Sequence, residues 1–144
     1  MKGAILIIGD KEVDSTKLVA QAESHGVSID LIENVKKRIN DISEKLFSLS
    51  SKDYDIIFTI GGTGMDKDDV TPEATEMVVD KKIPGLEFFI LHETVNSAYT
   101  GMFARIVAGV RKNTIIVNLP AMNYEIVFTK IMDAARKLRE LKGI

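Results

Sequence analysis

The sequence contains no cysteine and no tryptophan, and only two of its 144 residues are histidines. Without cysteine, the chain has no disulfide framework, no thiolate metal site and no cysteine nucleophile. The two histidines, His25 and His92, are too few and too far apart in the sequence to indicate a zinc site. A chain without cysteine suits a reducing compartment, and we expect this protein to act in the cytoplasm.

Long apolar runs and a strong net charge are also absent. No apolar stretch approaches about 18 residues, so we expect no membrane span and no membrane partner. The formal net charge is −2, which gives no overall field favouring nucleic acid. The apolar residues 1–8 are followed by Gly9-Asp10-Lys11-Glu12, where a signal peptide would place small residues. We therefore interpret the start of the chain as a buried strand.

Linkers, repeats and low-complexity tracts are missing as well. Hydrophobic residues make up 45% of the chain and charged residues 28%, which is an ordinary balance for a globular domain. A chain of this length buries enough surface to fold without disulfides or metals. We therefore expect residues 1–144 to form a single domain.

The first half of the chain alternates between strand and helix patterns. Apolar and β-branched runs at 4–8, 28–32 and 54–60 predict three strands. Between them, 15–25 carries an apolar stripe that ends before a glycine, and 39–49 has apolar residues spaced three and four apart. Both patterns predict amphipathic helices. This β-α-β-α-β order is typical of a parallel sheet wrapped by helices.

The second half adds helices and a hairpin. Thr71-Pro72-Glu73 predicts a helix start with Thr71 as its cap. The aromatic-rich stretch 86–103 is expected to be helical with a break, its aromatic residues belonging to the core or to a subunit interface. Strands at 105–110 and 114–119 predict a β-hairpin that ends at a proline. The inner face of a last helix, 124–141, is expected to consist of Ile131, Ala134, Ala135, Leu138 and Leu141.

Together these patterns predict an α/β fold. We expect a three-layer sandwich in which a mostly parallel sheet, extended by a β-hairpin, has helices on both faces. In such a sheet the loops that leave the carboxyl ends of the strands share one edge, where ligands bind.

The segment Gly61-Gly62-Thr63-Gly64 follows a predicted strand and precedes a predicted helix. Three glycines in four residues permit positive φ angles and leave the backbone unshielded, so the amides can form an anion-binding nest. The segment is neither a Walker A sequence nor a GxGxxG motif. From these residues alone, a phosphate site and a tight turn without a ligand are equally good interpretations.

Three aspartates follow the glycine turn. Three carboxylates so close in sequence repel one another if they share a direction, so we interpret Asp66 and Asp68 as a solvated acidic loop. Asp69 comes directly before the predicted helix and beside the glycine turn. A carboxylate combined with ligand phosphates is the usual way that proteins hold Mg²⁺, and we expect Asp69 to bind this metal.

These two motifs resemble the signature of a known family. Gly61 to Gly64, four intervening residues, and then Asp69-Val70-Thr71-Pro72-Glu73-Ala74 look like the molybdopterin adenylyltransferase and MoaB-like family. The likeness continues at Arg105, in 107–111 and through 113–120, and it covers most of the chain in the same order.

This resemblance implies a reaction and a set of site residues. Such transferases use ATP and magnesium to attach AMP to the terminal phosphate of molybdopterin, and they commonly form trimers or hexamers. By the family pattern, Gly61, Gly62, Thr63 and Gly64 contribute to the phosphate site and Asp69 is tied to catalysis. At the same sheet edge we expect Asp10 and Pro120 to bind the ligand. The pattern leaves open whether Arg105 reaches the site, crosses a subunit boundary or forms a structural salt bridge.

The sequence departs from the family at the expected binding edge. The usual glycine and second proline after Leu119-Pro120 are replaced in Ala121-Met122-Asn123, and basic residues 36–38 stand where transferases carry proline and acids. Ala104 replaces a serine, and Gly9-Asp10 only partly matches the usual start. Two hypotheses follow: a magnesium-dependent adenylyltransferase, or a molybdopterin-binding carrier without transfer activity. A nucleotide-cleaving relative of the competence-damage proteins is less favoured, because their glycine loop differs.

Overall fold

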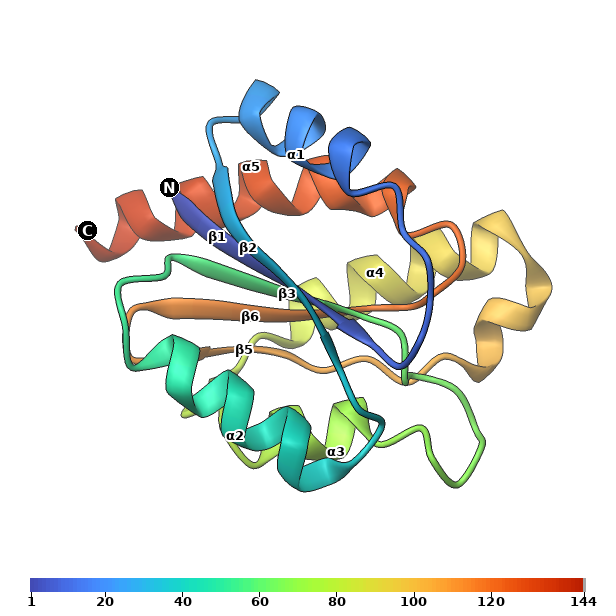
Figure 1. The fold of residues 1–144 in the computed structure, drawn as a ribbon. Coiled ribbons are helices and arrows are strands. Elements are labelled where there is room, and N and C mark those ends of the chain that lie inside the picture. The colour runs from blue at the N-terminus through green and yellow to red at the C-terminus, as the bar shows by residue number, and fades with distance from the viewer. Residues whose placement is uncertain (144) are drawn as a thin grey trace.

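The computed structural model describes the backbone of residues 1–143 and the side chains among them except that of Ile126. Its centre is a six-stranded sheet in the order β2-β1-β3-β6-β5-β4 (Figure 1). The first four strands in this order pair in parallel, and β5 and β4 join antiparallel to their neighbours. The strand bounds are β1 Lys2–Ile8, β2 Ser28–Val35, β3 Ile56–Ile60, β4 Lys81–Lys82, β5 Ala108–Arg111 and β6 Thr114–Leu119.

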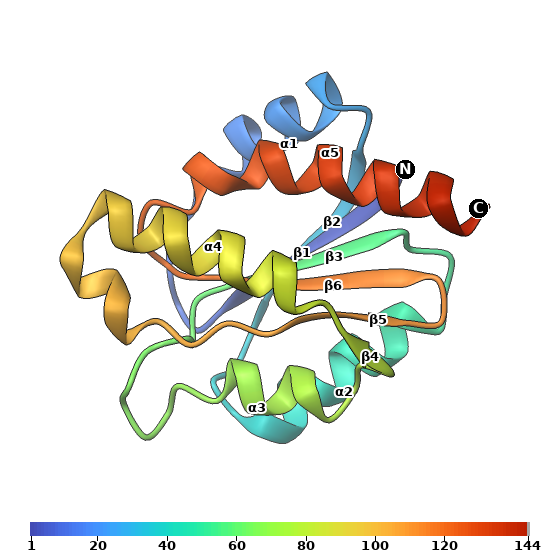
Figure 2. The same ribbon diagram turned by 180° about the vertical axis from the view of Figure 1, so that it is seen from behind.

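Helices cover both faces of this sheet. Figures 1 and 2 show α1, α4 and α5 on one side and α2 and α3 on the other. The helix bounds are α1 Ser15–Ser24, α2 Ile39–Ser50, α3 Thr71–Glu76, α4 Pro84–Ser97 and α5 Glu125–Lys142, with a 3-10 helix η1 at Tyr99–Phe103. The expected α/β architecture, a mostly parallel sheet with a hairpin between two helical layers, is confirmed.

The alternation of side chains along the central strands produces two cores. On β1, Ile5 and Ile7 pack with α1 and α5 in one core, whereas Leu6 and Ile8 pack with α2 and α3 in the other. Successive residues of a strand point to opposite faces, so an uninterrupted apolar strand supplies both layers. This explains why the buried strands read as continuous apolar runs.

Several predicted details differ from the structure. Thr71 does not cap α3: Val70 occupies the cap position, and the Thr71 hydroxyl donates to the carbonyl of Gly61. On α5, Ala134 and Leu141 are exposed, while Phe128 and Met132 are buried. Spacing therefore predicted only part of the inner face of α5 correctly. The short edge strand β4 was not predicted, because two residues leave no periodic signal.

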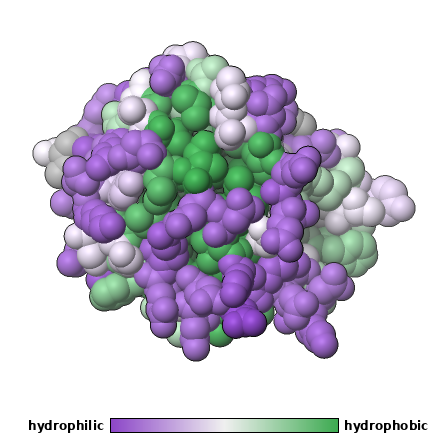
Figure 3. All heavy atoms as spheres, in the orientation of Figure 1, coloured by the Kyte–Doolittle hydropathy of each residue, from purple (hydrophilic) through white to green (hydrophobic). Residues whose placement is uncertain are grey.

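Phe89 packs against the buried core, but the other aromatic side chains of 86–103 lie at the surface. The helix breaks at Ala98, as predicted, but Phe88, Tyr99 and Phe103 are 71%, 76% and 58% exposed. Apart from these aromatic residues, Figure 3 shows an apolar area on the face that carries the edge strand β2. Hydrophilic residues surround most of this area. Within residues 1–143, no helix combines the length and the hydrophobicity that a membrane span needs.

Candidate functional site

The carboxyl ends of the parallel strands meet at one edge of the sheet and open into a pocket. Ile8 pairs with Val35, and Ile60 pairs with Leu119, so the loops that follow these strands start side by side. The pocket has a volume of about 430 Å³. It is lined by Lys11, Lys37, Gly62, Thr63, Gly64, Asp66, Asp69, Thr100, Phe103, Ala104, Pro120, Ala121 and Met122.

The glycine loop is held in shape through its carbonyl groups. The carbonyls of Gly61 and Gly62 accept from the hydroxyl and the amide of Thr71, at 3.0 and 3.1 Å. Those of Thr63 and Gly64 accept from the amide and the Nε of Arg105, at 2.8 and 2.9 Å. All four carbonyl oxygens of the loop are therefore bonded to the protein.

Most amides of the same loop, by contrast, have no protein partner among the described residues. Among the described residues, no backbone or side-chain acceptor bonds the amides of Gly62, Thr63 and Gly64, although the amide of Gly61 donates to Leu119. A trans peptide points its N–H opposite to its C=O, and no peptide bond here is cis. Because the carbonyls are tied back into the protein, each N–H group points the opposite way from its bonded carbonyl, and Gly62, Thr63 and Gly64 line the pocket. Unpaired N–H donors of this kind suit an anion.

Only glycine fits the middle of this loop. Gly62 has a φ of +69°, and a Cβ placed on it would lie 2.1 Å from the Thr71 hydroxyl oxygen. A side chain there would thus strain the backbone and break the bond that orients the loop. The close approach of Thr71 therefore explains the glycine at this position, and the pocket opens beside the turn.

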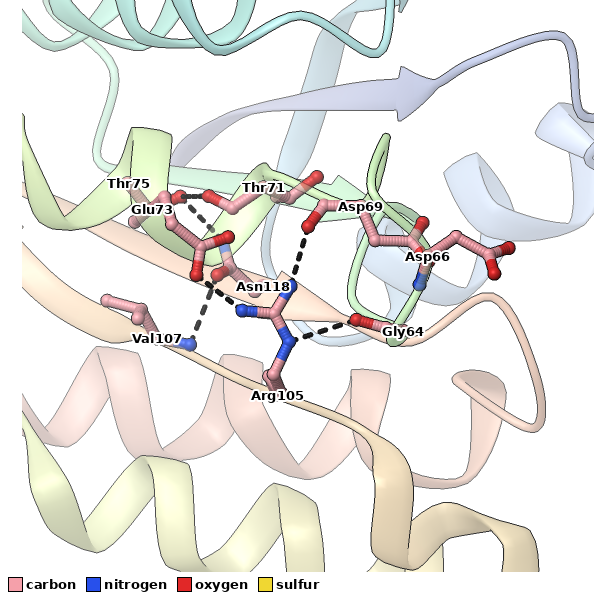
Figure 4. A network of polar contacts seen from close by, with 9 residues as sticks. All are labelled: Gly64, Asp66, Asp69, Thr71, Glu73, Thr75, Arg105, Val107 and Asn118. Atoms are coloured by element: carbon pink, nitrogen blue, oxygen red, sulfur yellow. Dashed lines mark hydrogen bonds and ion pairs between the residues drawn. The ribbon is translucent and has the colours of Figure 1, made fainter.

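Arg105 fastens the glycine loop to the acidic loop and to α3 (Figure 4). Besides bonding Gly64, its guanidinium donates to the backbone carbonyl of Asp69 at 2.6 Å and pairs with the carboxylate of Glu73. The sequence left three roles open for Arg105, and these contacts agree with a structural salt bridge within one chain. Arg105 is not among the residues that line the pocket.

A buried amide side chain supports the loop from below (Figure 4). Asn118 on β6 is fully buried and donates to the hydroxyls of Thr59 and Thr75, at 3.0 and 2.9 Å. Its carbonyl oxygen accepts from the amide of Val107. Thr75 donates in turn to the carbonyl of Thr71, so a chain of bonds runs from the core to the glycine loop. A network satisfied in this way fixes the geometry of the elements that it joins.

Asp69 is nearly buried at the floor of the pocket. One carboxylate oxygen lies 2.9 Å from the ammonium of Lys37, and the other accepts from the amide of Asp66 at 3.0 Å. Burial alone would raise the pKa of Asp69, but the bonds from Lys37 and Asp66, with the positive charges of Lys37 and Arg105, outweigh it. The pKa of Asp69 is therefore held below its usual value.

Two lysines line the pocket beside the free amides. The side-chain carbons of Lys11 lie within 3.5 Å of a Cβ placed on Gly61, and those of Lys37 lie 3.3 Å from one placed on Gly9. The aliphatic part of each lysine side chain thus passes over a glycine, which has no side chain to block it. The sequence interpretation noted the basic cluster at 36–38 but gave Lys11 no role, since a single lysine in a loop carries no pattern.

The other predicted site residues divide into two groups. Pro120, Ala121 and Met122 line the pocket, whereas Asp10 does not. The ligand-binding roles predicted for Gly61 to Gly64, Asp10 and Pro120, and the metal role predicted for Asp69, stay predictions. Thr100 and Phe103 form a further part of the wall, and sequence reasoning did not assign them to the site. The residue types of Thr100 and Phe103 do not by themselves indicate a site. These residues reach the pocket because the chain leaves the helical path of α4 at Ala98 and continues as η1.

The residues present do not form a resident metal site. Among the described residues, no group of three or more histidine, cysteine, aspartate or glutamate side chains is placed to hold a metal ion. Mg²⁺ needs near-octahedral oxygen ligands at short distance, and both oxygens of Asp69 already have donors.

Arg111, part of the sequence likeness, lies at the other end of the sheet. It is buried, donates to the hydroxyls of Ser50 and Ser51 at 3.1 and 3.0 Å, and lies 3.9 Å from the centre of the Phe47 ring. These contacts join β5 to α2. They give Arg111 a structural role away from the pocket.

Comparison with known proteins places this geometry in a family. The family described as "Probable molybdopterin binding domain" matches residues 4–132. Molybdenum cofactor biosynthesis protein B of Staphylococcus epidermidis is 35% identical over 129 residues, which cover 81% of this chain and 73% of that protein. The molybdopterin adenylyltransferase of Helicobacter pylori is 37% identical over 82 residues, 56% of this chain and 47% of that protein. The chain thus aligns with about half the length of this adenylyltransferase.

The fold agrees with the sequence matches. The crystal structure of the molybdopterin biosynthesis enzyme MoaB from Thermus thermophilus superposes with a TM-score of 0.81 and 28% identity, covering 99% of this chain and 97% of that one. The family model covers most of the sequence and spans every residue that lines the pocket. The chain belongs to the molybdopterin-binding domain family of molybdenum cofactor biosynthesis.

Proposed function

We propose that this protein binds molybdopterin by its terminal phosphate in the glycine-loop pocket and transfers AMP from ATP to that phosphate. The observation that carries this proposal is the set of free amides at Gly62, Thr63 and Gly64, held open because their carbonyl neighbours are bonded to Thr71 and Arg105. Three unpaired N–H groups on successive residues suit a phosphoryl group, which offers three acceptor oxygens.

The proposed transfer needs charge neutralisation more than a protein nucleophile. A terminal phosphate oxygen of molybdopterin attacks the α-phosphorus of ATP and forms a P–O bond, while the bond to the bridging oxygen breaks and pyrophosphate leaves with its electron pair. Two polyanions must approach, so positioning and electrostatic stabilisation dominate. The loop amides, Lys11 and Lys37 supply these donors at the pocket wall. ATP enters as its magnesium complex, so the ion arrives with the substrate.

Product formation tests the transfer. The chain is incubated with molybdopterin and Mg-ATP, and adenylylated molybdopterin and pyrophosphate are measured. We expect both products, and we expect Asp69→Asn to suppress them, because the amide leaves Lys37 without its carboxylate partner. Asp68→Asn, on the same loop but exposed, is the matched control and keeps the activity. An absence of product at high protein concentration, with a known transferase active in parallel, would rule out transfer.

A second candidate function is a molybdopterin carrier without transfer activity. Two observations favour it: the carboxylate of Asp69 is already paired with Lys37, and Ala121 and Met122 present apolar side chains to the pocket. Calorimetry separates the two functions. Molybdopterin binding without ATP turnover supports the carrier, and an absence of binding by either ligand defeats both proposals.

The family resemblance also suggests an assembly and a location. We propose that the protein acts in the cytoplasm as a trimer or a hexamer. The exposed side chains of Phe88, Tyr99 and Phe103 on α4 and η1 support an interface there. Analytical ultracentrifugation tests the assembly, and a stable monomer at high concentration would contradict it.

A further inference from the structure

Lys37 and the backbone of Asp66 occupy both carboxylate oxygens of Asp69, the residue expected to hold a metal. The Lys37 ammonium lies 2.9 Å from one carboxylate oxygen, and the backbone amide of Asp66 bonds the other at 3.0 Å. A divalent ion could reach Asp69 only by displacing a positive charge or by breaking the turn at Asp66. The carboxylate is thus already neutralised by the chain itself.

The structure around Lys37 keeps its side chain there. The stem crosses Gly9, where a Cβ would lie 3.3 Å from its Cγ and Cδ atoms. Gly9 is fixed between neighbouring strands, because its amide donates to Val35 and its carbonyl accepts from Asn34, at 2.8 and 2.9 Å. The Lys37 side chain is 35% exposed and lines the same pocket as the free amides of the glycine loop.

An ammonium in this place has donors left for a ligand. A lysine carries three N–H donors, and the bond to Asp69 uses one of them. Hydrogen bonds from a charged donor to a phosphate oxygen are among the strong ones. Lys37 therefore offers a phosphate what a metal offers, namely a fixed positive charge, without requiring a coordination shell.

We propose that the Lys37 ammonium is the built-in cation of this pocket, so that the phosphate of the ligand binds without a divalent metal held by the protein. In this arrangement Asp69 is a positioning residue that fixes Lys37 at the pocket wall. The inference rests on the proposed function for the identity of the ligand, a phosphate monoester, but the replacement of the metal by lysine is independent of it.

A titration of the protein alone with Mg²⁺ tests the replacement. Calorimetry and amide chemical shifts of the 61–69 loop are followed for the wild type and for Lys37→Asp. We expect no saturable binding to the wild type at millimolar Mg²⁺. Lys37→Asp is expected to gain it, because the new carboxylate joins Asp69 beside Asp66. Saturable binding by the wild type, with shifts centred on Asp69, would overturn the inference.

A second titration uses molybdopterin, with EDTA or with excess Mg²⁺. Wild-type affinity is expected to agree within about twofold between the two conditions. Lys37→Met, which keeps the length but removes the charge, should bind about tenfold more weakly in EDTA, as the loss of a charged hydrogen bond implies. Lys36→Met, at an exposed residue outside the pocket, is the matched control and should bind like the wild type.

The outcomes separate this inference from the proposed function. A tenfold or greater tightening of wild-type binding by Mg²⁺, or wild-type affinity of Lys37→Met in EDTA, contradicts the role of Lys37. If molybdopterin binds to no variant under either condition, the proposed function fails. The Mg²⁺ titration of the protein alone still decides whether lysine has replaced the metal.

Discussion

The polar groups at the two ends of the sheet differ in their hydrogen bonding. At the amino ends of the parallel strands, a hollow of about 280 Å³ is lined by residues 50–55 and 112–114 and by Arg139. Its polar groups bond one another: Arg139 pairs with Asp55 at 2.6 Å, and the Thr114 hydroxyl donates to the carbonyl of Tyr54 at 2.7 Å. At the carboxyl ends, the amides of Gly62 to Gly64 have no partner within the described residues.

The difference between the two hollows supports the proposal that the one at the carboxyl ends binds the ligand. Both hollows contain charged residues, so charge alone does not distinguish them. What differs is how the groups are bonded: the side chains of Arg139 and Thr114 at the amino edge have partners within the protein. At the carboxyl edge, protein donors bond the carbonyls of the glycine loop, and three successive N–H groups have no protein partner among the described residues. Buried and half-buried polar groups are normally paired, so these open donors support the proposed binding site.

The largest effect is expected for Gly62→Ala, which disrupts the glycine loop at the carboxyl edge of the sheet. The φ of +69° and the contact of 2.1 Å with the Thr71 hydroxyl leave no room for the methyl group. We expect a loss of about 2 kcal/mol in the free energy of unfolding, and the loss of molybdopterin binding measured by calorimetry. Gly85→Ala, where nothing lies within 4 Å of the new Cβ, is the control and should retain both properties.

A matched pair of arginine variants sharpens the comparison. Arg105→Met releases the carbonyl of Gly64 and the acidic loop, and we expect molybdopterin affinity to fall about tenfold. Arg111→Met, at the other edge, removes bonds to Ser50 and Ser51. It should lower the free energy of unfolding by about 1–2 kcal/mol with unchanged affinity. Equal effects of both variants on calorimetric affinity would show that the two edges are not separate.

The smallest expected effect concerns pH. Because the pKa of Asp69 is lowered in the folded protein, its contribution to stability is complete above the ordinary carboxyl pKa of about 3.9. This contribution is lost as the pH falls through the lowered value. Urea unfolding should therefore show Asp69→Asn to be less stable than the wild type by about 1 kcal/mol near neutral pH, with the gap closing in acid. Asp68→Asn is the matched control for net charge, and a gap independent of pH would refute the ion pair.

The sequence predicted the scaffold well because the relevant signals are local. Continuous apolar runs identified the strands at 4–8 and 54–60, and the spacing from Ile39 onward identified α2. The glycine turn was placed correctly at the end of β3, since three glycines between a strand and a helix have few other uses. The hairpin also followed from its two runs and the short polar turn between them.

The partners of the site residues were not predictable, because they come from distant parts of the chain. Thr71 next to a proline has the pattern of a helix cap, yet its hydroxyl bonds Gly61 across the turn. The basic residues at 36–38 were recognised as a departure from the family pattern, but only the folded chain shows Lys37 paired with Asp69. Similarly, the sequence showed that 86–103 is aromatic, whereas the break at Ala98 decides that Phe103 reaches the pocket.

The use of backbone amides on one wall has a consequence for ligand selectivity. An N–H group is the same at every peptide unit, so under the proposed function the glycine loop would contact phosphoryl oxygens without distinguishing what they are attached to. Discrimination between organic groups would then come from the wall of the pocket formed by Phe103, Ala121 and Met122. Substitutions on that wall can change the ligand while the grip on its phosphate stays intact, which separates affinity from selectivity within one small pocket.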